Sequence, residues 1–239
     1  MSFSGDNIPR SKSRRHVERI GHRGAKRELP ENTLAAFERA FVRGANAIEL
    51  DVHATADGVL VVHHDPVLGH TAGPVAGRAI SSLTERDVTT VELAAGITVP
   101  TLASVLAATP PDRRVYVEIK GEKIEGLVAE LVRGSQRDCA VHSFDHDAIA
   151  RLREIAPDIP RGILFEDRGV DIVGAVRRTG ARDVWPNFRL IDQPMVDRIH
   201  ALGCRAIAWT VNSAEVAADL MALGVDGLCG DDVRIFPTT

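Results

Sequence analysis

The chain has 239 residues, 44% of them hydrophobic and 26% charged, which is typical of a globular protein with a sizeable core. The formal net charge of −4 argues against a protein that binds nucleic acid through its overall charge. No apolar stretch approaches the ~20 residues needed to cross a bilayer, which argues against stable membrane insertion. A chain of this length fits one α/β barrel as a single unit.

The N-terminal segment is basic. We interpret residues 1–16 as a solvated, flexible leader, in preference to a segment that binds an anionic membrane or nucleic acid. Residues 17–239 are predicted to form a single domain. The basic cluster runs from Arg10 to Arg19 and contains Arg10, Lys12, Arg14, Arg15 and Arg19.

The cysteines are few and widely spaced. Cys139, Cys204 and Cys229 each lie in or beside an apolar run, and no motif spacing connects them. An odd number of such cysteines is typical of reduced thiols. The N-terminus also lacks the apolar region of a signal peptide. We therefore expect a soluble, cytoplasmic protein.

Short apolar, β-branched runs alternate with helical patterns along the chain. The predicted strands are Val17–Gly21, Ala47–Val52, Val115–Ile119, Cys139–Ser143, Arg161–Leu164, Asp183–Pro186, Arg205–Val211 and Gly227–Gly230. Apolar residues at helical spacing separate many of them, as at Phe37, Leu127, Leu152 and Ile199. This alternation indicates a parallel sheet covered by helices, and eight strands favour a closed (β/α)8 TIM barrel.

The run Val59–His63 interrupts this order. It follows Ala47–Val52 across Asp57-Gly58, a two-residue turn that favours an antiparallel hairpin. A parallel neighbour would need a crossover of about a dozen residues, so we interpret the run as a hairpin arm outside the barrel. Residues 66–100 are Gly- and Thr-rich and are predicted to form an insertion before a helix that starts near Thr101.

The end of the chain is short for a complete barrel. Only nine residues follow Gly230, so the last helix is predicted to be very short or absent. An open, doubly wound sheet is the alternative fold.

Charged and imidazole side chains gather where the predicted strands end. They are His22 and Arg23 after the first strand, Glu49 and Asp51 in the second, His64 after the hairpin arm, and Glu118 and Lys120 in the third. Catalytic groups of TIM barrels lie at the C-terminal ends of the strands. A spacing of two residues places both members of a pair on one face of the strand.

The predicted carboxylates would repel one another at a shared site unless a cation were bound. Oxygen ligands favour Mg²⁺ or Ca²⁺ over zinc. Taken singly, each pair is more typical of a solvated or salt-bridged surface, and His64 alone could cap a turn. Their convergence on one end of a barrel favours a functional site, because buried charges cost several kcal/mol unless paired or metal-bound. Four other histidines have no partners in the sequence and are interpreted as solvated or core-edge residues: His16, His142, His146 and His200.

Short motifs extend this pattern, in order, over nearly the whole chain from Arg19 to Asp231. They are His22-Arg23-Gly24, Pro30-Glu31-Asn32-Thr33, Glu49-Leu50-Asp51-Val52, Asp57-Gly58, His64-Asp65, Glu118-Ile119-Lys120, Ser143-Phe144, Trp209-Thr210-Val211-Asn212 and Gly224-Val225-Asp226-Gly227. Together they resemble the glycerophosphodiester phosphodiesterase family. The resemblance implies a TIM barrel with an insertion after the second strand.

The resemblance also implies a site and a reaction. The reaction is hydrolysis of a small-molecule glycerophosphodiester to an alcohol and glycerol 3-phosphate, dependent on one divalent cation, Mg²⁺ or Ca²⁺. The implied roles are general acid and base for His22 and His64, metal ligands for Glu49, Asp51 and Glu118, phosphate-binding cations for Arg23 and Lys120, and a pocket-lining aromatic for Trp209. The motifs specify no oligomeric state.

Two positions depart from the family pattern near the expected substrate mouth. His70 stands where the family usually has Arg, and Gly230-Asp231 stands where it has Thr-Asp. Two alternatives therefore stay open. One is a phospholipase C- or D-like phosphodiesterase acting on lysolipids or phosphoinositols, which the aromatic content of only 4% disfavours. The other is a catalytically silent binding protein on the same barrel, which the intact histidines and carboxylates disfavour.

Overall fold

The structure, a computed structural model, describes residues 17–69 and 75–237. The predicted leader, residues 1–16, and the histidines at positions 16 and 70 lie outside the described residues. The barrel strands are β1 (Glu18–His22), β2 (Ala47–Ala54), β6 (Arg114–Ile119), β7 (Asp138–Ser143), β8 (Arg161–Phe165), β9 (Asp183–Pro186), β10 (Arg205–Ala208) and β11 (Gly227–Gly230).

The barrel is closed. Neighbouring barrel strands pair in parallel, and β1 pairs with β2 on one side and with β11 on the other. The prediction of a (β/α)8 TIM barrel is therefore confirmed, and the alternative of an open, doubly wound sheet is wrong. The first and last strands are joined although they lie more than 200 residues apart in sequence, at Glu18 and Gly227.

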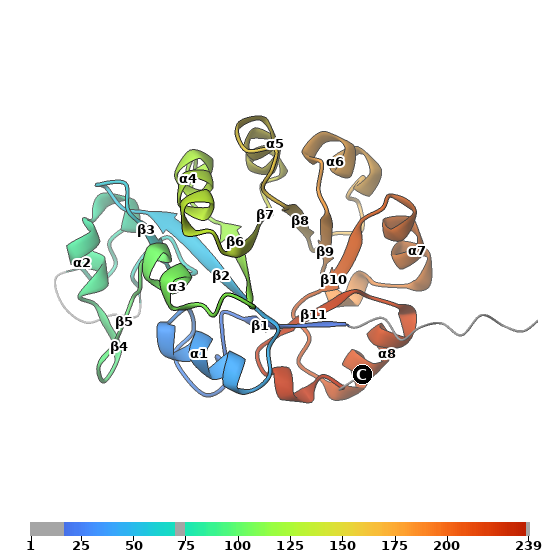
Figure 1. Ribbon diagram of the computed structural model, residues 1–239, viewed down its shortest axis with the longest axis horizontal. Coiled ribbons are helices and arrows are strands. Elements are labelled where there is room, and N and C mark those ends of the chain that lie inside the picture. Colours follow the sequence, from blue (N-terminus) through green and yellow to red (C-terminus); the bar gives the residue numbers. More distant parts are fainter. Residues whose placement is uncertain (1–16, 70–74, 238–239) are drawn as a thin grey trace, which may run out of the picture.

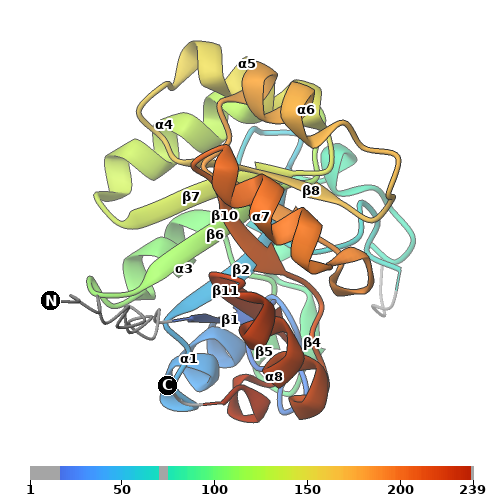
Figure 2. The same ribbon diagram turned by 90° about the vertical axis from the view of Figure 1, so that its right-hand side faces the viewer.

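Helices surround the strands on the outside of the barrel (Figure 1 and, from the side, Figure 2). They are α1 (Leu34–Val42), α3 (Leu102–Ala108), α4 (Glu125–Ser135), α5 (His146–Ile155), α6 (Ile172–Thr179), α7 (Gln193–Ala201) and α8 (Ala214–Leu223). Thr33, Thr101 and Ser213 are N-caps whose hydroxyls accept backbone N–H groups. After β11 the described chain has only the 3₁₀ turn η3 (Val233–Ile235), as the short end of the sequence predicted.

Alternation along the strands produces two cores. Ile48, Leu50 and Val52 of β2 point outward into the large core between strands and helices. The opposite residues fill the barrel interior, where Ile20, Ala47, Tyr116, Ala140, Leu164, Trp185, Ile207 and Cys229 form a separate cluster. Because the side-chain period is two, the next inward positions toward the strand C-termini include Glu49, Glu118 and His142. The interior core thus forms the floor of the polar end of the barrel.

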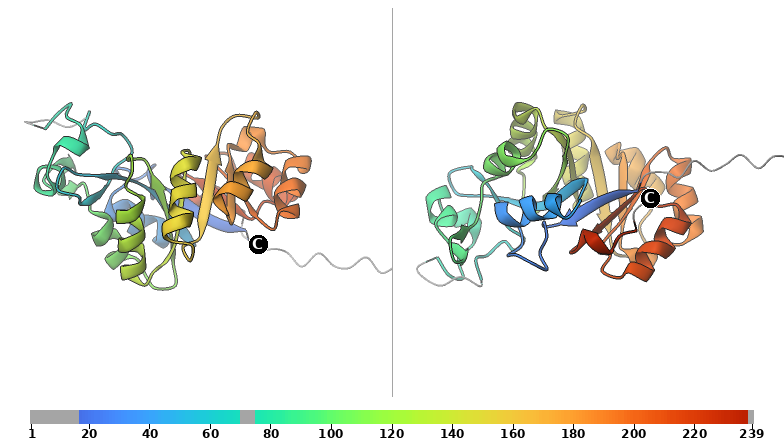
Figure 3. Two further views of the ribbon diagram at one scale, coloured as in Figure 1. Left: turned by 90° about the horizontal axis from the view of Figure 1, so that it is seen from above. Right: turned by 60° about the horizontal axis from the view of Figure 1, so that its bottom comes forward.

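The hairpin arm is present as predicted. Strand β3 (Leu60–Val62) pairs antiparallel with β2, from Val52 opposite Val62 to Ala54 opposite Leu60. Beyond it, residues 66–100 contain η1 (Ile80–Ser82), α2 (Glu85–Thr89), β4 (Glu92–Ala94) and β5 (Ile97–Thr98) in their described part. These elements stand to one side of the barrel (Figure 3) and have a small core of their own around Leu68, Ile80 and Leu83.

One strand is shorter than predicted. The sequence predicted Arg205–Val211, but β10 ends at Ala208. Beyond it Trp209 makes an isolated bridge to Asn187, while the N–H of Val211 donates to the carbonyl of Cys229. Beyond Ala208 the pairing with β9 and β11 thus continues only as isolated contacts. Within the described residues, no helix is long and apolar enough to span a membrane.

Candidate active site

A cavity of about 370 Å³ opens at the C-terminal end of the barrel strands. Seven of the eight predicted site residues line it: His22, Arg23, Glu49, His64, Glu118, Lys120 and Trp209. The eighth, Asp51, is fully buried beside them. The other lining residues are His142, Phe144, Leu164, Glu166, Trp185 and Cys229.

The loop after β1 holds Arg23 in a constrained position. Arg23 has φ of +54°, and Gly24 after it has φ of +84°. A Cβ on Gly24 would lie 2.7 Å from the carbonyl carbon of Ala36, so this position requires glycine. The backbone N–H of Arg23 donates to Oε2 of Glu49 at 3.1 Å, and its Nη1 donates to Glu31 at 2.9 Å. The guanidinium is thereby held at the edge of the cavity.

Asp51 is surrounded by groups of positive polarity. Its Oδ2 accepts from Nδ2 of Asn32 at 2.8 Å and lies 3.1 Å from Nε of Arg23. Its Oδ1 lies 3.7 Å from Nζ of Lys120. Asn32, part of the Pro30-Glu31-Asn32-Thr33 motif, thus orients a buried carboxylate.

Glu49, Glu118 and His142 form a compact, buried donor set. One ligand atom from each lies within 4.8 Å of the other two. Nζ of Lys120 contacts Oε1 of Glu118 at 3.0 Å, and Nε2 of His142 lies 3.8 Å from Oε1 of Glu49. Burial, together with the nearby charge of Asp51, raises the pKa of Glu49 and of Glu118. Burial lowers the pKa of His142 to about 4.

Two histidines in the cavity each contact an aspartate carboxylate through Nδ1. Nδ1 of His22 lies 2.7 Å from Oδ1 of Asp231, whose Oδ2 accepts from Nδ2 of Asn212. Nδ1 of His64 lies 2.7 Å from Oδ1 of Asp65. Burial lowers the pKa of His64, and the positive charges of neighbouring arginine and lysine side chains act in the same direction. In both rings Nε2 is left for a group in the cavity.

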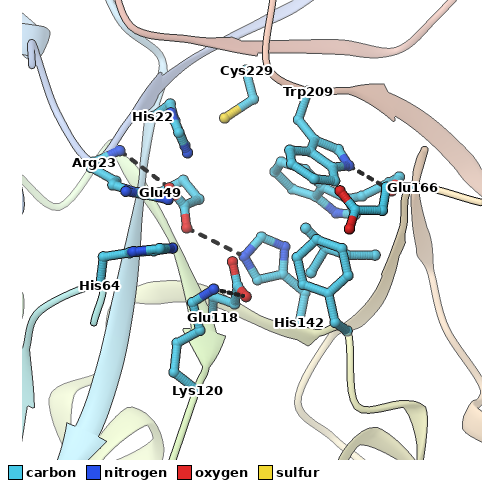
Figure 4. Close-up of a pocket in the computed structure, with 13 residues that line it drawn as sticks. His22, Arg23, Glu49, His64, Glu118, Lys120, His142, Glu166, Trp209 and Cys229 are labelled. Carbon is cyan, nitrogen blue, oxygen red and sulfur yellow. Dashed lines mark hydrogen bonds and ion pairs between the residues drawn. The ribbon is translucent and has the colours of Figure 1, made fainter. Parts of the chain in front are cut away.

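The cavity has a charged half and an aromatic half. His22, Arg23 and His64 lie on one side with Glu49 between them, whereas Trp209 and Glu166 lie opposite (Figure 4). The rings of Phe144 and Trp209 meet edge to face, with centroids 5.2 Å apart. Nε1 of Trp209 donates to the carbonyl of Trp185 at 2.9 Å, which fixes the indole in place.

The model of the glycerophosphoryl diester phosphodiesterase family matches residues 22–235, which include every predicted site residue. The chain belongs to this family. A glycerophosphodiester phosphodiesterase of Caldanaerobacter subterraneus subsp. tengcongensis is 31% identical over 89% of this chain and 93% of that protein. One from Bacillus altitudinis is 30% identical over the same shares. The crystal structure of a glycerophosphodiester phosphodiesterase from Agrobacterium tumefaciens is similar with a TM-score of 0.80, at 26% identity, covering 92% of this chain and 98% of that one.

The prediction of an enzyme, a glycerophosphodiester phosphodiesterase, is therefore confirmed. The order of the motifs along the chain allowed this, because each motif alone is common and the full series is not.

The interpretation of His142 from the sequence is wrong. The sequence predicts a core-edge or solvated residue, but in this phosphodiesterase the His142 side chain lines the cavity and is only 1% exposed. The register of β6 and β7 sets Glu118 beside His142. Strand periodicity carried a signal for this position: Cys139 and Val141 face the outer core, so Ala140 and His142 must face inward.

Asp231 and Phe144 belong to the site although the sequence predicted no role for either. Asp231, noted in the sequence only as part of a departure from the family pattern, contacts His22. Burial acts to raise the pKa of Asp231, but its hydrogen bonds from His22 and Asn212 and the charge of Lys26 lower it overall. Of the remaining histidines in the described chain, His146 and His200 lie outside the cavity lining, as expected.

Proposed function

We propose that this protein hydrolyses glycerophosphodiesters to an alcohol and glycerol 3-phosphate, with His22 and His64 as the acid–base pair. The observation that carries the proposal is the pair of imidazoles, each with a carboxylate at Nδ1, beside Arg23 in one cavity. Two histidines serve general acid and general base chemistry near neutral pH.

We also propose that the protein binds one divalent cation, Mg²⁺ or Ca²⁺, with Glu49, Asp51 and Glu118 as its ligands. The residues fit such an ion because three buried carboxylates meet here and the pKa of two of them is raised by burial and mutual repulsion. When bound, the ion would act as a Lewis acid on the phosphoryl oxygens.

The remaining steps fall to the chain itself. Arg23 and Lys120 line the cavity and offset the negative charge of the diester, which otherwise repels a nucleophile. One histidine accepts the proton of the attacking hydroxyl, and the other protonates the leaving alkoxide oxygen. Asp231 and Asp65 orient the two rings for this exchange. The same pair serves attack by the neighbouring glycerol hydroxyl or by water.

The substrate we propose is small and water-soluble, and Trp209 packs against its alcohol part. The aromatic half of the cavity is limited to a few side chains, which supports a short head group over an acyl chain. The three described cysteines are buried and unpaired, which supports a reducing, cytoplasmic location.

The test is release of glycerol 3-phosphate from glycerophosphocholine, glycerophosphoethanolamine and glycerophosphoglycerol, with EDTA and after adding Mg²⁺ or Ca²⁺. We expect His22→Ala and His64→Ala to lower kcat by about 10²- to 10⁴-fold. His200→Ala, whose ring contacts Asp226 outside the cavity, is the matched control and should retain full activity.

Full activity of either cavity variant would contradict the assignment of the acid–base pair. Faster turnover of a lysophospholipid than of any glycerophosphodiester would favour the phospholipase alternative. Metal binding with no turnover on any diester would favour the silent binding protein.

A further inference from the structure

The side chain of His142 is buried in the barrel, and within the described chain it has no hydrogen-bond partner. It is 1% exposed, and neither Nδ1 nor Nε2 is hydrogen-bonded by any described residue. A buried polar atom left unpaired costs about 1–3 kcal/mol. Such a group inside a site calls for a ligand, because most buried polar atoms in folded proteins are satisfied.

Packing fixes the direction of this ring. Its centroid lies 4.5 Å from that of Trp185, edge to face, and 6.0 Å from that of Tyr116. The side chain comes from β7 and points toward Glu49 and Glu118 (Figure 4). The ring is thus held by its neighbours with its nitrogens at the carboxylates.

The distances fit a shared cation better than a direct bond. Nε2 of His142 lies 3.8 Å from Oε1 of Glu49, too far for a hydrogen bond. Two ligands, each about 2.1 Å from one ion, lie at most about 4.2 Å apart. The pair falls inside that limit. A ligand atom of Glu118 lies within 4.8 Å of one from each of the other two residues.

We propose that His142 adds a nitrogen ligand to the cation site formed by Glu49, Asp51 and Glu118, and that this ligand raises the affinity of the site for first-row transition ions above its affinity for Mg²⁺ and Ca²⁺. The inference deepens the proposed function and rests on its metal site. Mg²⁺ and Ca²⁺ prefer oxygen ligands, whereas imidazole suits first-row transition ions such as Zn²⁺, Fe²⁺ and Ni²⁺. Oδ2 of Asp51 is engaged by Asn32 and Arg23, but within the described chain Oδ1 of Asp51 and both His142 nitrogens have no hydrogen-bond partner.

The experiment measures binding and ligand identity in the intact, metal-free protein. Dissociation constants of Mg²⁺, Ca²⁺, Mn²⁺ and Zn²⁺ are measured by competition, and bound Mn²⁺ is examined by pulsed EPR for coupling to ¹⁴N. We expect an imidazole ¹⁴N signal and tighter binding of Zn²⁺ and Mn²⁺ than of Mg²⁺. His142→Phe keeps a ring against Trp185 and removes both nitrogens.

In His142→Phe we expect the ¹⁴N signal to vanish and the affinity for Zn²⁺ to fall at least about 10-fold, since even residues that only support ligands cost 10- to 100-fold. Mg²⁺ affinity should change by less than about 3-fold. His22→Ala lines the same cavity and is the control: its ¹⁴N signal should remain.

The inference is overturned if wild-type protein with bound Mn²⁺ shows no ¹⁴N coupling, a result that needs no variant to fold. It is also overturned if His142→Phe keeps the wild-type ratio of Zn²⁺ to Mg²⁺ affinity. Failure of the proposed function looks different: nitrogen ligation is present, but no glycerophosphodiester is turned over.

Discussion

At the scale of single residues, the site concentrates negative charge that the fold itself does not neutralise. Glu49 and Glu118 are both less than a tenth exposed, and Asp51 lies beside them. Their cationic neighbours are Arg23 and Lys120, which also face the cavity where a phosphate would bind. The fold thus gives up stability to keep carboxylates available, as functional sites commonly do.

This predicts that Glu49→Gln stabilises the metal-free protein at alkaline pH. The folded pKa of Glu49 is raised above its ordinary 4.5 by burial and by Asp51. A carboxyl whose pKa is raised on folding stabilises the protein fully below its unfolded pKa. That stabilisation is lost as the pH rises through its folded pKa. In EDTA at about pH 8, Glu49→Gln should therefore unfold at a higher temperature than wild type. The expected shift is about 2–4 °C for each kcal/mol gained in the free energy of unfolding. Near pH 4.5 the difference should shrink.

Differential scanning calorimetry across this pH range gives the answer. Glu154→Gln, an exposed change on α5, should leave the pH profile unchanged. A lower unfolding temperature of Glu49→Gln at pH 8 in EDTA would contradict the electrostatic explanation.

At the scale of elements, loops and strand ends position the site. The loop after β1 approaches α1 so closely that Gly24 has no room for a Cβ, and this approach sets Arg23 against Glu49. The β2–β3 hairpin brings His64 to the cavity, and the carbonyl of His64 contacts Nε2 of His53 at 3.1 Å. The hairpin is defined by the local Asp57-Gly58 turn, which explains why the sequence predicted it.

Gly24→Ala should destabilise the protein more than the same substitution at another glycine with positive φ. Gly96, in the β4–β5 turn, has φ of +72° with open space around it. Gly96→Ala should cost about 1–2 kcal/mol for backbone conformation alone. Gly24→Ala should cost a further 1–3 kcal/mol for the contact with Ala36. Urea unfolding measures both, and equal costs would show that the loop moves freely away from α1.

At the scale of the whole molecule, the two ends of the barrel have different tasks. The C-terminal end holds the cavity, whereas the N-terminal end is closed by paired charges. There the hydroxyl of Tyr116 donates to Oε2 of Glu18 at 2.7 Å and accepts from Nη1 of Arg205 at 2.9 Å. In TIM barrels the C-terminal end of the strands commonly holds the active site, whereas the N-terminal end contributes to stability.

Tyr116→Phe should therefore lower stability and leave turnover nearly unchanged. Loss of the hydroxyl leaves Glu18 and Arg205 with one partner fewer and should cost about 1–3 kcal/mol. The ring that packs on Trp185 is kept. Urea unfolding and diester hydrolysis are measured on the same sample. A large fall in kcat with unchanged stability would contradict this division of the barrel.

Much of this architecture follows from the sequence by itself. Periodicity of two and of 3.6 residues is local, so strands, helices and the Asp57-Gly58 hairpin could be predicted, as could the parity that sets Glu49 and Asp51 on one face. The ordered motifs identified the family.

Tertiary structure decided which side chains meet. Closure of β1 on β11 brings Asp231 to His22, and the register of β6 and β7 brings His142 to Glu118 and Glu49. The end of β10 at Ala208 likewise depends on how far its pairing with β9 and β11 extends. The physical reason is common to all three. Spacing along a strand defines the face on which a side chain lies, but pairing between distant strands determines its partner and its burial.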